Sequence, residues 1–153
     1  MREYLFRGKR KDNGEWVDGF LFHDYSTFLL RFLWKIQHMN KFGMPIGHYE
    51  VGPETVGQYT GLRDCKRTEE YPEGQRIFEG DIVHVLGNQQ VEDWKRVDYI
   101  GLIAFLDAGF CVIDGTIDDH GFRRYGLCRL DFDLEVIGNI HDNPELLKEG
   151  GEE

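Results

Sequence analysis

The close spacing of short apolar runs in the second half of the chain is the feature that most constrains the fold. Runs rich in β-branched and aromatic residues predict strands at 81–86, 97–106, 110–114, 122–129 and 134–140. Asp107-Ala108-Gly109 predicts a three-residue hairpin loop, with positive φ at the glycine. Five short strands within about 60 residues indicate a small barrel of the SH3-like kind.

The first half of the chain also has strand character, with a less regular pattern. Residues 3–8 and 15–22 predict a β-hairpin that turns at Asp12-Asn13-Gly14. Residues 28–39 fit an alternating strand or a helix capped by Ser26, and the frequent aromatic residues favour the strand.

The middle of the chain is rich in glycine and proline. Between Gly43 and Gly57 this composition predicts no extended regular structure, only a helical turn at 53–56. A short strand is predicted at 57–62, and the polar segment 64–75 is predicted to be a surface loop.

These patterns divide the chain into three parts. Residues 1–75 are an N-terminal β-rich region with loops, residues 76–142 are the barrel, and residues 143–153 are a short helix with a frayed acidic tail. The expected fold is mainly β: an N-terminal β-hairpin region packed on a C-terminal SH3-like small β-barrel, with a short C-terminal helix.

Composition limits the choice of function. The 153 residues suffice for one domain, or for two small ones that share a core, without a metal or a disulfide. The 28 acidic against 18 basic residues give a net charge of −10, which opposes nonspecific binding to nucleic acid or to an anionic membrane. A local basic patch is still compatible with this charge.

Cysteine and histidine usage gives no sign of a metal site. Three widely spaced cysteines without a CxxC pair indicate small buried hydrophobic side chains in a reducing cytosol. Six scattered histidines form no HxH or HxxxH pair, so we expect no metal and no cofactor. Without a secretory signal or an apolar run of roughly 20 residues, the chain is predicted to be cytoplasmic.

Two carboxylates, Glu79 and Asp81, interrupt the apolar segment 76–85. On a strand they would share one face, where a coupled pair can perform acid–base chemistry or bind a divalent metal. The simpler interpretation is a turn at Gly80, with Asp81 accepting backbone N–H groups and Glu79 in solvent.

The segment 55–64 gathers hydrogen-bonding side chains around two glycines. Glycines can let backbone amides approach a phosphate, but this segment is neither a GxGxxG motif nor a P-loop. Its side chains can equally join two halves of the fold. The candidate binding residues are Thr55, Gln58, Tyr59, Thr60 and Asp64.

A second group of residues supports a nucleic-acid interpretation, against the sign of the net charge. Single strands bind to basic grooves that carry aromatic side chains for stacking. The candidate face consists of Trp94, Lys95, Arg96, Arg123, Arg124 and Tyr125. Asp119-His120 resembles a base with its orienting partner, but a nucleophile at a fixed spacing is missing and a solvated turn is the simpler interpretation.

The segment 28–34, FLLRFLW, has more large apolar side chains than one small strand usually buries. Core packing is the simpler explanation. The alternative is a subunit interface, because a large apolar patch on a small domain usually meets a partner.

Three segments in this order, 51–64, 76–85 and 135–147, resemble the YopX family of phage and prophage proteins. The opening YLFRG and GEWVDG are similar to the family's N-terminal hairpin, whereas 23–48 and 65–75 depart from its pattern. The resemblance implies a mainly β fold with an SH3-like barrel in the C-terminal half, and a mobile-element origin, but no activity. Asn139, on a motif position, joins the candidate binding residues.

Three functions are compatible with these observations, in order of preference. The first is a noncatalytic, self-associating protein-binding module with a host or phage protein as a further partner. The second is a single-stranded nucleic-acid-binding barrel, and the third is a metal-assisted hydrolase that uses Glu79 and Asp81. We therefore expect a homo-oligomer that does not associate with membranes, with nucleic acid as the less favoured partner.

Overall fold

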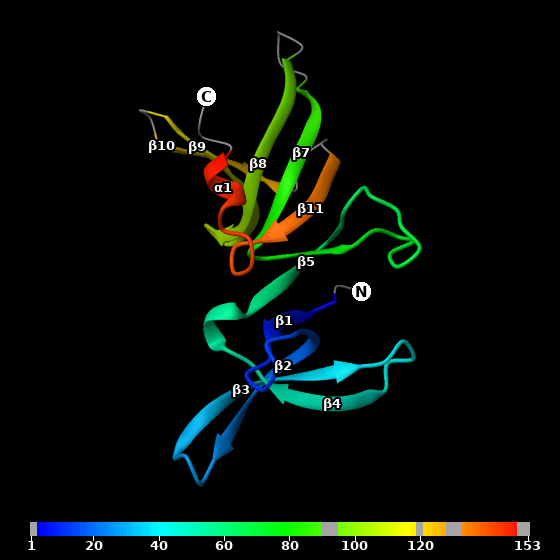
Figure 1. The fold of residues 1–153 in the computed structure, drawn as a ribbon, viewed down its shortest axis with the longest axis vertical. Coiled ribbons are helices and arrows are strands. Elements are labelled where there is room, and N and C mark those ends of the chain that lie inside the picture. Colours follow the sequence, from blue (N-terminus) through cyan, green and yellow to red (C-terminus); the bar gives the residue numbers. More distant parts are fainter. Residues whose placement is uncertain (1–2, 90–94, 119–120, 128–132, 150–153) are drawn as a thin grey trace. The chain divides into compact units, whose positions relative to one another are not determined.

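The computed structural model describes residues 3–89, 95–118, 121–127 and 133–149, which form mainly antiparallel strands (Figure 1). The prediction of a mainly β protein is confirmed. The chain divides into two compact units, Met1–Tyr59 and Thr60–Glu153. Within the described ranges, no helix is both long enough and apolar enough to cross a membrane.

The first unit is an antiparallel sheet built around the hairpin of its first two strands. In spatial order the strands are β4 (Pro45–Glu50), β3 (Arg31–Met39), β2 (Trp16–Ser26), β1 (Phe6–Lys9) and the start of β5 (Gly57–Arg63). The predicted turn before β2 is confirmed: Gly14 has a φ of 74°, and the Glu15 N–H donates to Asn13 Oδ1 at 3.0 Å.

The strand predicted over 28–39 exists from Arg31 onward, after a turn at 27–30. The prediction of no extended structure after Gly43 is wrong, because β4 lies there. β4 is at the edge of the sheet, where proline costs no ladder hydrogen bond, and Pro45 is its first residue.

A small core holds the first unit together. Its buried residues are Val17, Ile36 and Val51, against which Phe6, Leu21, Trp34, Tyr49 and Val56 pack. The 3₁₀ turn η1 (Pro53–Thr55), in the segment predicted to form a helical turn, leads from this core into β5.

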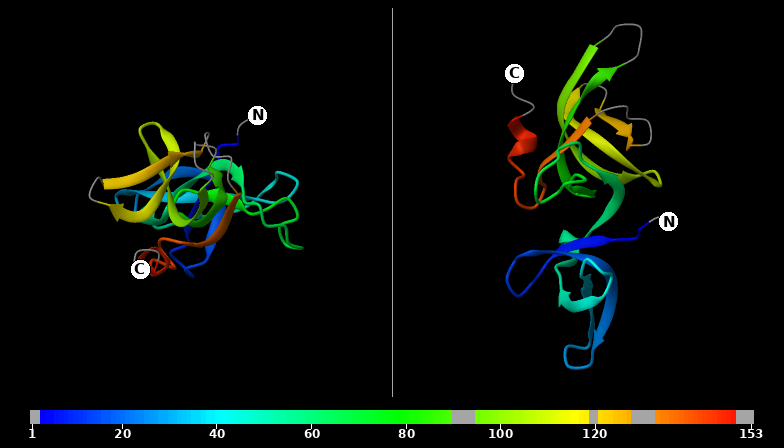
Figure 2. Two further views of the ribbon diagram at one scale, coloured as in Figure 1. Left: turned by 90° about the horizontal axis from the view of Figure 1, so that it is seen from above. Right: turned by 90° about the vertical axis from the view of Figure 1, so that its right-hand side faces the viewer.

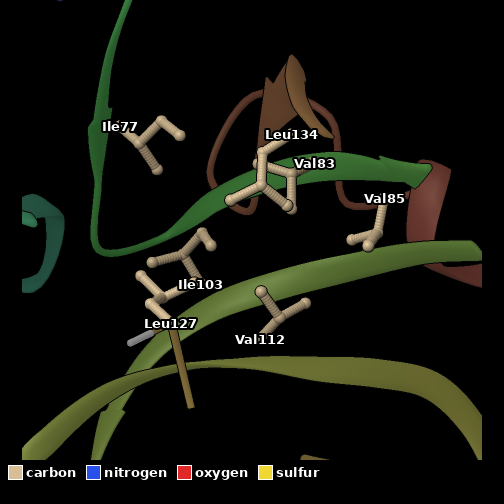
Figure 3. Close-up of a cluster of buried hydrophobic side chains, with 7 residues drawn as sticks. All are labelled: Ile77, Val83, Val85, Ile103, Val112, Leu127 and Leu134. Carbon is tan, nitrogen blue, oxygen red and sulfur yellow. The ribbon is translucent and has the colours of Figure 1, made fainter. Parts of the chain in front are cut away.

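The second unit contains a five-stranded antiparallel sheet. In spatial order its strands are β10 (Gly121–Gly126), β9 (Gly109–Asp118), β8 (Lys95–Leu106), β7 (Asp81–Gln89) and β11 (Asp133–Asn139). The short strand β6 (Arg76–Phe78) pairs beside β5. Apolar side chains from several of these elements meet in one cluster (Figure 3): Ile77, Val83, Val85, Ile103, Val112, Leu127 and Leu134.

The closed SH3-like barrel predicted for 76–142 is not found in the part of this range that the structure describes. β11 returns to pair with β7, and β10 pairs with β9, so each is an end strand of the sheet. A closed barrel would require a ladder between these end strands. The described residues therefore form an open sheet.

The loop between β8 and β9 is shorter than predicted. Leu106 pairs with Gly109, so the loop has two residues, Asp107 and Ala108, whose φ values are 49° and 61°. Positive φ at both central residues is typical of the type I′ turn, whose twist matches that of the flanking strands. The glycine is therefore the first residue of β9, and the expected positive φ at Gly109 is wrong.

The short C-terminal helix is present as α1 (Leu146–Glu149), which contacts β8. Before it, the Leu146 N–H donates to the Asn143 carbonyl at 3.1 Å, and the Leu147 N–H to the Pro144 carbonyl at 3.4 Å. Proline therefore lies in the turn that leads into the helix, where its missing N–H costs nothing.

Replacement of Gly19 by alanine tests the close approach of β2 and β3. Gly19 has a φ of 152°, and a Cβ there would lie 2.0 Å from the Gln37 carbonyl oxygen. We expect Gly19→Ala to lower the free energy of unfolding by about 3 kcal/mol or more, because backbone must move. Gly14→Ala, with positive φ but open space, should cost only about 1 kcal/mol. Equal losses in urea titrations would contradict this account.

Candidate functional site

Thr55 joins the turn η1 to strand β1 within the first unit. The Lys9 N–H donates to Thr55 Oγ1 at 2.9 Å, and the Thr55 hydroxyl donates to the Gly52 carbonyl at 2.6 Å. Gln58 pairs with Phe6 in the β1–β5 ladder, and the side chain of Tyr59 is buried. These three candidate binding residues therefore have local structural partners.

Asp64 is a buried carboxylate that organises the loop 64–75 of the second unit. Its side chain is 4% exposed, and it accepts the Gln75 N–H at 2.8 Å and the Val136 N–H at 3.3 Å. Its own N–H donates to the Gln75 carbonyl at 2.8 Å. Asp64 thus closes the loop and ties it to β11. Thr60 has a similar role, because its hydroxyl donates to the Ile77 carbonyl at 2.8 Å.

Cys65 and Lys66 follow Asp64 at the surface. Burial raises the pKa of the Cys65 thiol, and the neighbouring carboxylates of Asp133 and Asp64 raise it further. Lys66 Nζ lies 2.9 Å from Glu135 Oε1, and this hydrogen bond raises the pKa of the lysine. A thiol with a raised pKa is a poor nucleophile at neutral pH, so this neighbourhood does not favour covalent catalysis.

Glu79, Gly80 and Asp81 form a turn between β6 and β7. Gly80 has a φ of 89°, and its N–H and carbonyl bond Ile103 and Ile140 at 2.8 Å and 2.9 Å. Asp81 is 1% exposed and accepts the Phe78 N–H at 2.7 Å. Glu79 is half-buried. The different surroundings of the two carboxylates support the turn interpretation.

Asn139 organises the turn that follows β11. Its Oδ1 accepts the N–H groups of His141 and Asp142, each at 3.0 Å, and its Nδ2 donates to Asp142 Oδ2 at 3.1 Å. This is the local side-chain-to-backbone bonding that asparagine commonly makes in turns. In the described part of the chain, no group of three His, Cys, Asp or Glu side chains is arranged to hold a metal ion.

The strand register does not bring the predicted nucleic-acid face together. Lys95 and Arg96 begin β8, Arg123, Arg124 and Tyr125 lie in β10, and Trp94 is outside the described residues. Arg124 lies opposite Ile113, which lies opposite Leu102 in β8. Arg96 is six positions from Leu102, or about 20 Å along the strand. The backbone therefore places Arg96 and Arg124 in two separate regions.

Two arrangements were not indicated by the sequence. Arg10 stacks on the Tyr49 ring, 3.9 Å from its centroid, while also bonding Asp12. On the second unit, His84 Nε2 lies 2.6 Å from Asp98 Oδ1. His84 is half-buried and Asp98 exposed on a sheet surface. The Asp119-His120 pair considered above lies outside the described residues.

The larger group of exposed apolar residues in the first unit lies on the β2–β3 hairpin, and a smaller one, Phe42, Met44 and Ile46, lies at the β3–β4 turn and in β4. β1 pairs only with residues 16–19 of β2, and β4 only with residues 35–39 of β3. The rest of the hairpin is a two-stranded ribbon that runs out beyond both neighbours (Figures 1 and 2). We call residues 20–37 the aromatic arm; β4 still pairs with residues 35–37 at its base, and only two strands remain beyond them.

One face of the aromatic arm continues the apolar surface of the core. Side chains alternate along both strands, so this face carries Leu21, His23, Tyr25, Phe32, Trp34 and Ile36. The Tyr25 and Phe32 rings meet edge to face at 5.1 Å, and those of His23 and Trp34 at 4.4 Å. Tyr25 is 49% and Phe32 64% exposed, whereas Ile36 is fully buried. The same face is therefore core at its base and exposed toward its end.

The opposite face of the arm is mixed: it carries the charged Asp24, Arg31 and Lys35 together with the apolar Phe20, Phe22 and Leu33. Lys35 Nζ lies 2.5 Å from Asp24 Oδ2, and this hydrogen bond lowers the pKa of the aspartate. Arg31 also alternates onto this face, as does Phe20, which is 48% exposed.

Three consecutive apolar residues form the tip of the arm. Phe28 is 92% exposed, Leu29 47% and Leu30 75%. The Leu29 N–H donates to Ser26 Oγ at 3.1 Å, and Leu30 has a φ of 53°. The core-packing explanation for 28–34 is therefore wrong for the tip and for Phe32.

The fold and these sites define a mainly β-strand protein whose motif residues hold turns and whose exposed apolar residues project on a hairpin. Comparison with protein families identifies the family, because the model described as YopX protein matches residues 5–148. The chain belongs to the YopX family, which is of uncharacterised function. Comparisons with curated proteins and with solved structures gave no match.

Asp81→Ala should destabilise the protein, because it removes a buried carboxylate that accepts the Phe78 N–H. We expect a loss of about 2–3 kcal/mol in the free energy of unfolding, and a smaller loss for Asp81→Asn, which keeps an acceptor. Glu79→Ala should change it by no more than about 0.5 kcal/mol. An Asp81→Ala variant with unchanged melting and a lost interaction would instead assign the residue to a binding site.

Asp64→Ala should loosen the loop 64–75. The Gln75 and Val136 N–H groups lose their acceptor, so we expect a loss of about 2–3 kcal/mol and faster proteolysis within the loop. Glu69→Ala, in the exposed part of the loop, is the matched control. Limited trypsin digestion checks the prediction, since its cleavage sites Arg63, Lys66 and Arg67 lie beside the residue that makes these hydrogen bonds, Asp64. Equal cleavage rates in both variants would contradict it.

Proposed function

We propose that the protein is a noncatalytic, self-associating protein-binding module of a phage or prophage, acting in the cytoplasm of a bacterial host. The observation that carries this proposal is the aromatic arm, an exposed apolar face and tip on a chain with a net charge of −10. Exposed apolar patches of this kind mark protein-interaction sites on soluble proteins.

The carboxylate motifs support a noncatalytic role. Asp64 and Asp81 are buried, and each accepts backbone N–H groups. A carboxylate committed to backbone donors is poorly placed to exchange protons with a substrate or to bind a metal. The hydrolase with Glu79 and Asp81 is for this reason the weaker candidate.

Nucleic-acid binding is also less well supported than the protein-binding module. The register separates Arg96 from Arg124. Three basic side chains of the first unit have acidic partners: Asp12 for Arg10, Glu50 for Lys11 and Asp24 for Lys35. A single-strand groove needs adjacent unpaired cations and stacking rings.

An SH3-like barrel remains part of this proposal. A meander from β7 to β10, with β11 returning beside β7, is compatible with a small barrel that the described residues leave open. Its motif turns at Gly80 and Asn139 would then lie at the ends of the barrel strands β7 and β11.

The solution mass of the full chain tests the proposal. Multi-angle light scattering after gel filtration should give a mass of at least two copies. That mass should vary little with salt, because the contact is apolar. A fluorescent single-stranded oligonucleotide titrated at low salt should give no shift. A strict monomer from which no specific protein partner is recovered would contradict the proposal, as would tight oligonucleotide binding.

A further inference from the structure

We propose that the aromatic arm packs face to face against the same arm of a second copy of this chain, across a two-fold axis. This rests on the proposed function and names the partner and the surface. The contact consists of the exposed end of the aromatic face, with Tyr25 and Phe32, and of the apolar tip at 28–30.

The first reason is that the arm lacks support of its own. Beyond the last residues that β1 and β4 cover, only two strands remain, and an isolated two-stranded hairpin is marginally stable in water. Its aromatic rings contact each other edge to face, which leaves part of each ring uncovered. A second layer against this face would provide the packing that Phe6 and Val56 provide at the base.

The second reason is the chemistry of the tip. Turns usually take glycine, asparagine or aspartate, which tolerate positive φ and bond water. Here Leu30 adopts a φ of 53°, a conformation that costs an ordinary side chain roughly 1 kcal/mol, and Phe28 is almost fully exposed. Both unfavourable terms are offset when the tip is buried against another protein.

The third reason is area. At roughly 200 Å² for a complete aromatic or leucine side chain, the exposed parts of Tyr25, Phe28, Leu29, Leu30 and Phe32 provide roughly 650 Å² of apolar surface. A stable interface of standard size buries about 800 Å² on each partner, rim included. The arm therefore supplies most of one side of such an interface.

The fourth reason favours an identical partner. No acidic residue occurs from Tyr25 to Trp34, and the one basic residue there, Arg31, alternates onto the opposite face. A charged partner would have no counter-charge to meet on this face. Copies of a chain with a net charge of −10 repel each other elsewhere, so a neutral face is where they approach with least repulsion.

A two-fold axis follows from this self-complementarity. When one patch meets itself, the contact is isologous and closes as a dimer. Tyr25 and Phe32 already pair at the favoured edge-to-face angle of 61°, and a facing copy offers the same rings in the same geometry.

The test compares serine substitutions on the two faces of the arm in the full chain, by sedimentation velocity over a range of concentrations. Tyr25→Ser/Phe32→Ser removes two rings from the proposed contact, and Phe28→Ser removes the tip residue with least contact to its own chain. Phe20→Ser is the matched control, since Phe20 is 48% and Tyr25 49% exposed on opposite faces. Circular dichroism and thermal melting establish that each variant folds.

We expect the double variant to weaken dimerisation about a hundredfold or more, Phe28→Ser about tenfold, and Phe20→Ser less than about threefold. If the wild type oligomerises and the double variant does so equally, the arm inference is overturned while self-association stands. Equal weakening by Phe20→Ser overturns the face assignment and with it the inference. A monomeric wild type overturns the inference and the self-association proposal together, leaving only binding to another protein.

Discussion

The difference in length between β2 and the strands beside it determines the architecture of the first unit. β2 has 11 residues, but β1 covers only its first four, and β3 follows it to the end. At Gly19, the last residue that β1 covers, β2 comes so close to β3 that no side chain fits. β2 therefore contributes Val17 and Leu21 to the core around this position and continues beyond them as an exposed ribbon.

In the second unit, two buried carboxylates determine the course of the backbone. Asp64 ties a loop of polar residues to β11, and Asp81 fixes the turn at which β6 becomes β7. Each replaces ladder hydrogen bonds that an irregular backbone cannot make, and a buried N–H without an acceptor is costly. The segments that resemble the family therefore include the carboxylates that fix these turns.

The sequence predicts the strands well where hydrophobic alternation is local, as in β7, β8 and β11. The sequence does not predict β4, because Pro45 and Gly47 are unfavourable in strands. The strand forms nevertheless, because it pairs with the edge of β3. The basic face could not be predicted from the sequence either, since the distance between Arg96 and Arg124 depends on the register of three strands. Alternation assigns Tyr25 and Phe32 to one face, but whether a neighbour covers that face is a tertiary property.

The distribution of charge makes an exposed apolar arm tolerable. Residues 20–37 contain one acidic and two basic side chains, so the whole acidic excess of the chain lies outside the arm. Repulsion between the remaining surfaces opposes random association through other contacts. An isologous contact buries the same patch on both copies, so a closed pair exposes no further copy of that patch. In the proposed dimer, hydrophobic attraction at this neutral ribbon would give a closed pair rather than open-ended aggregation.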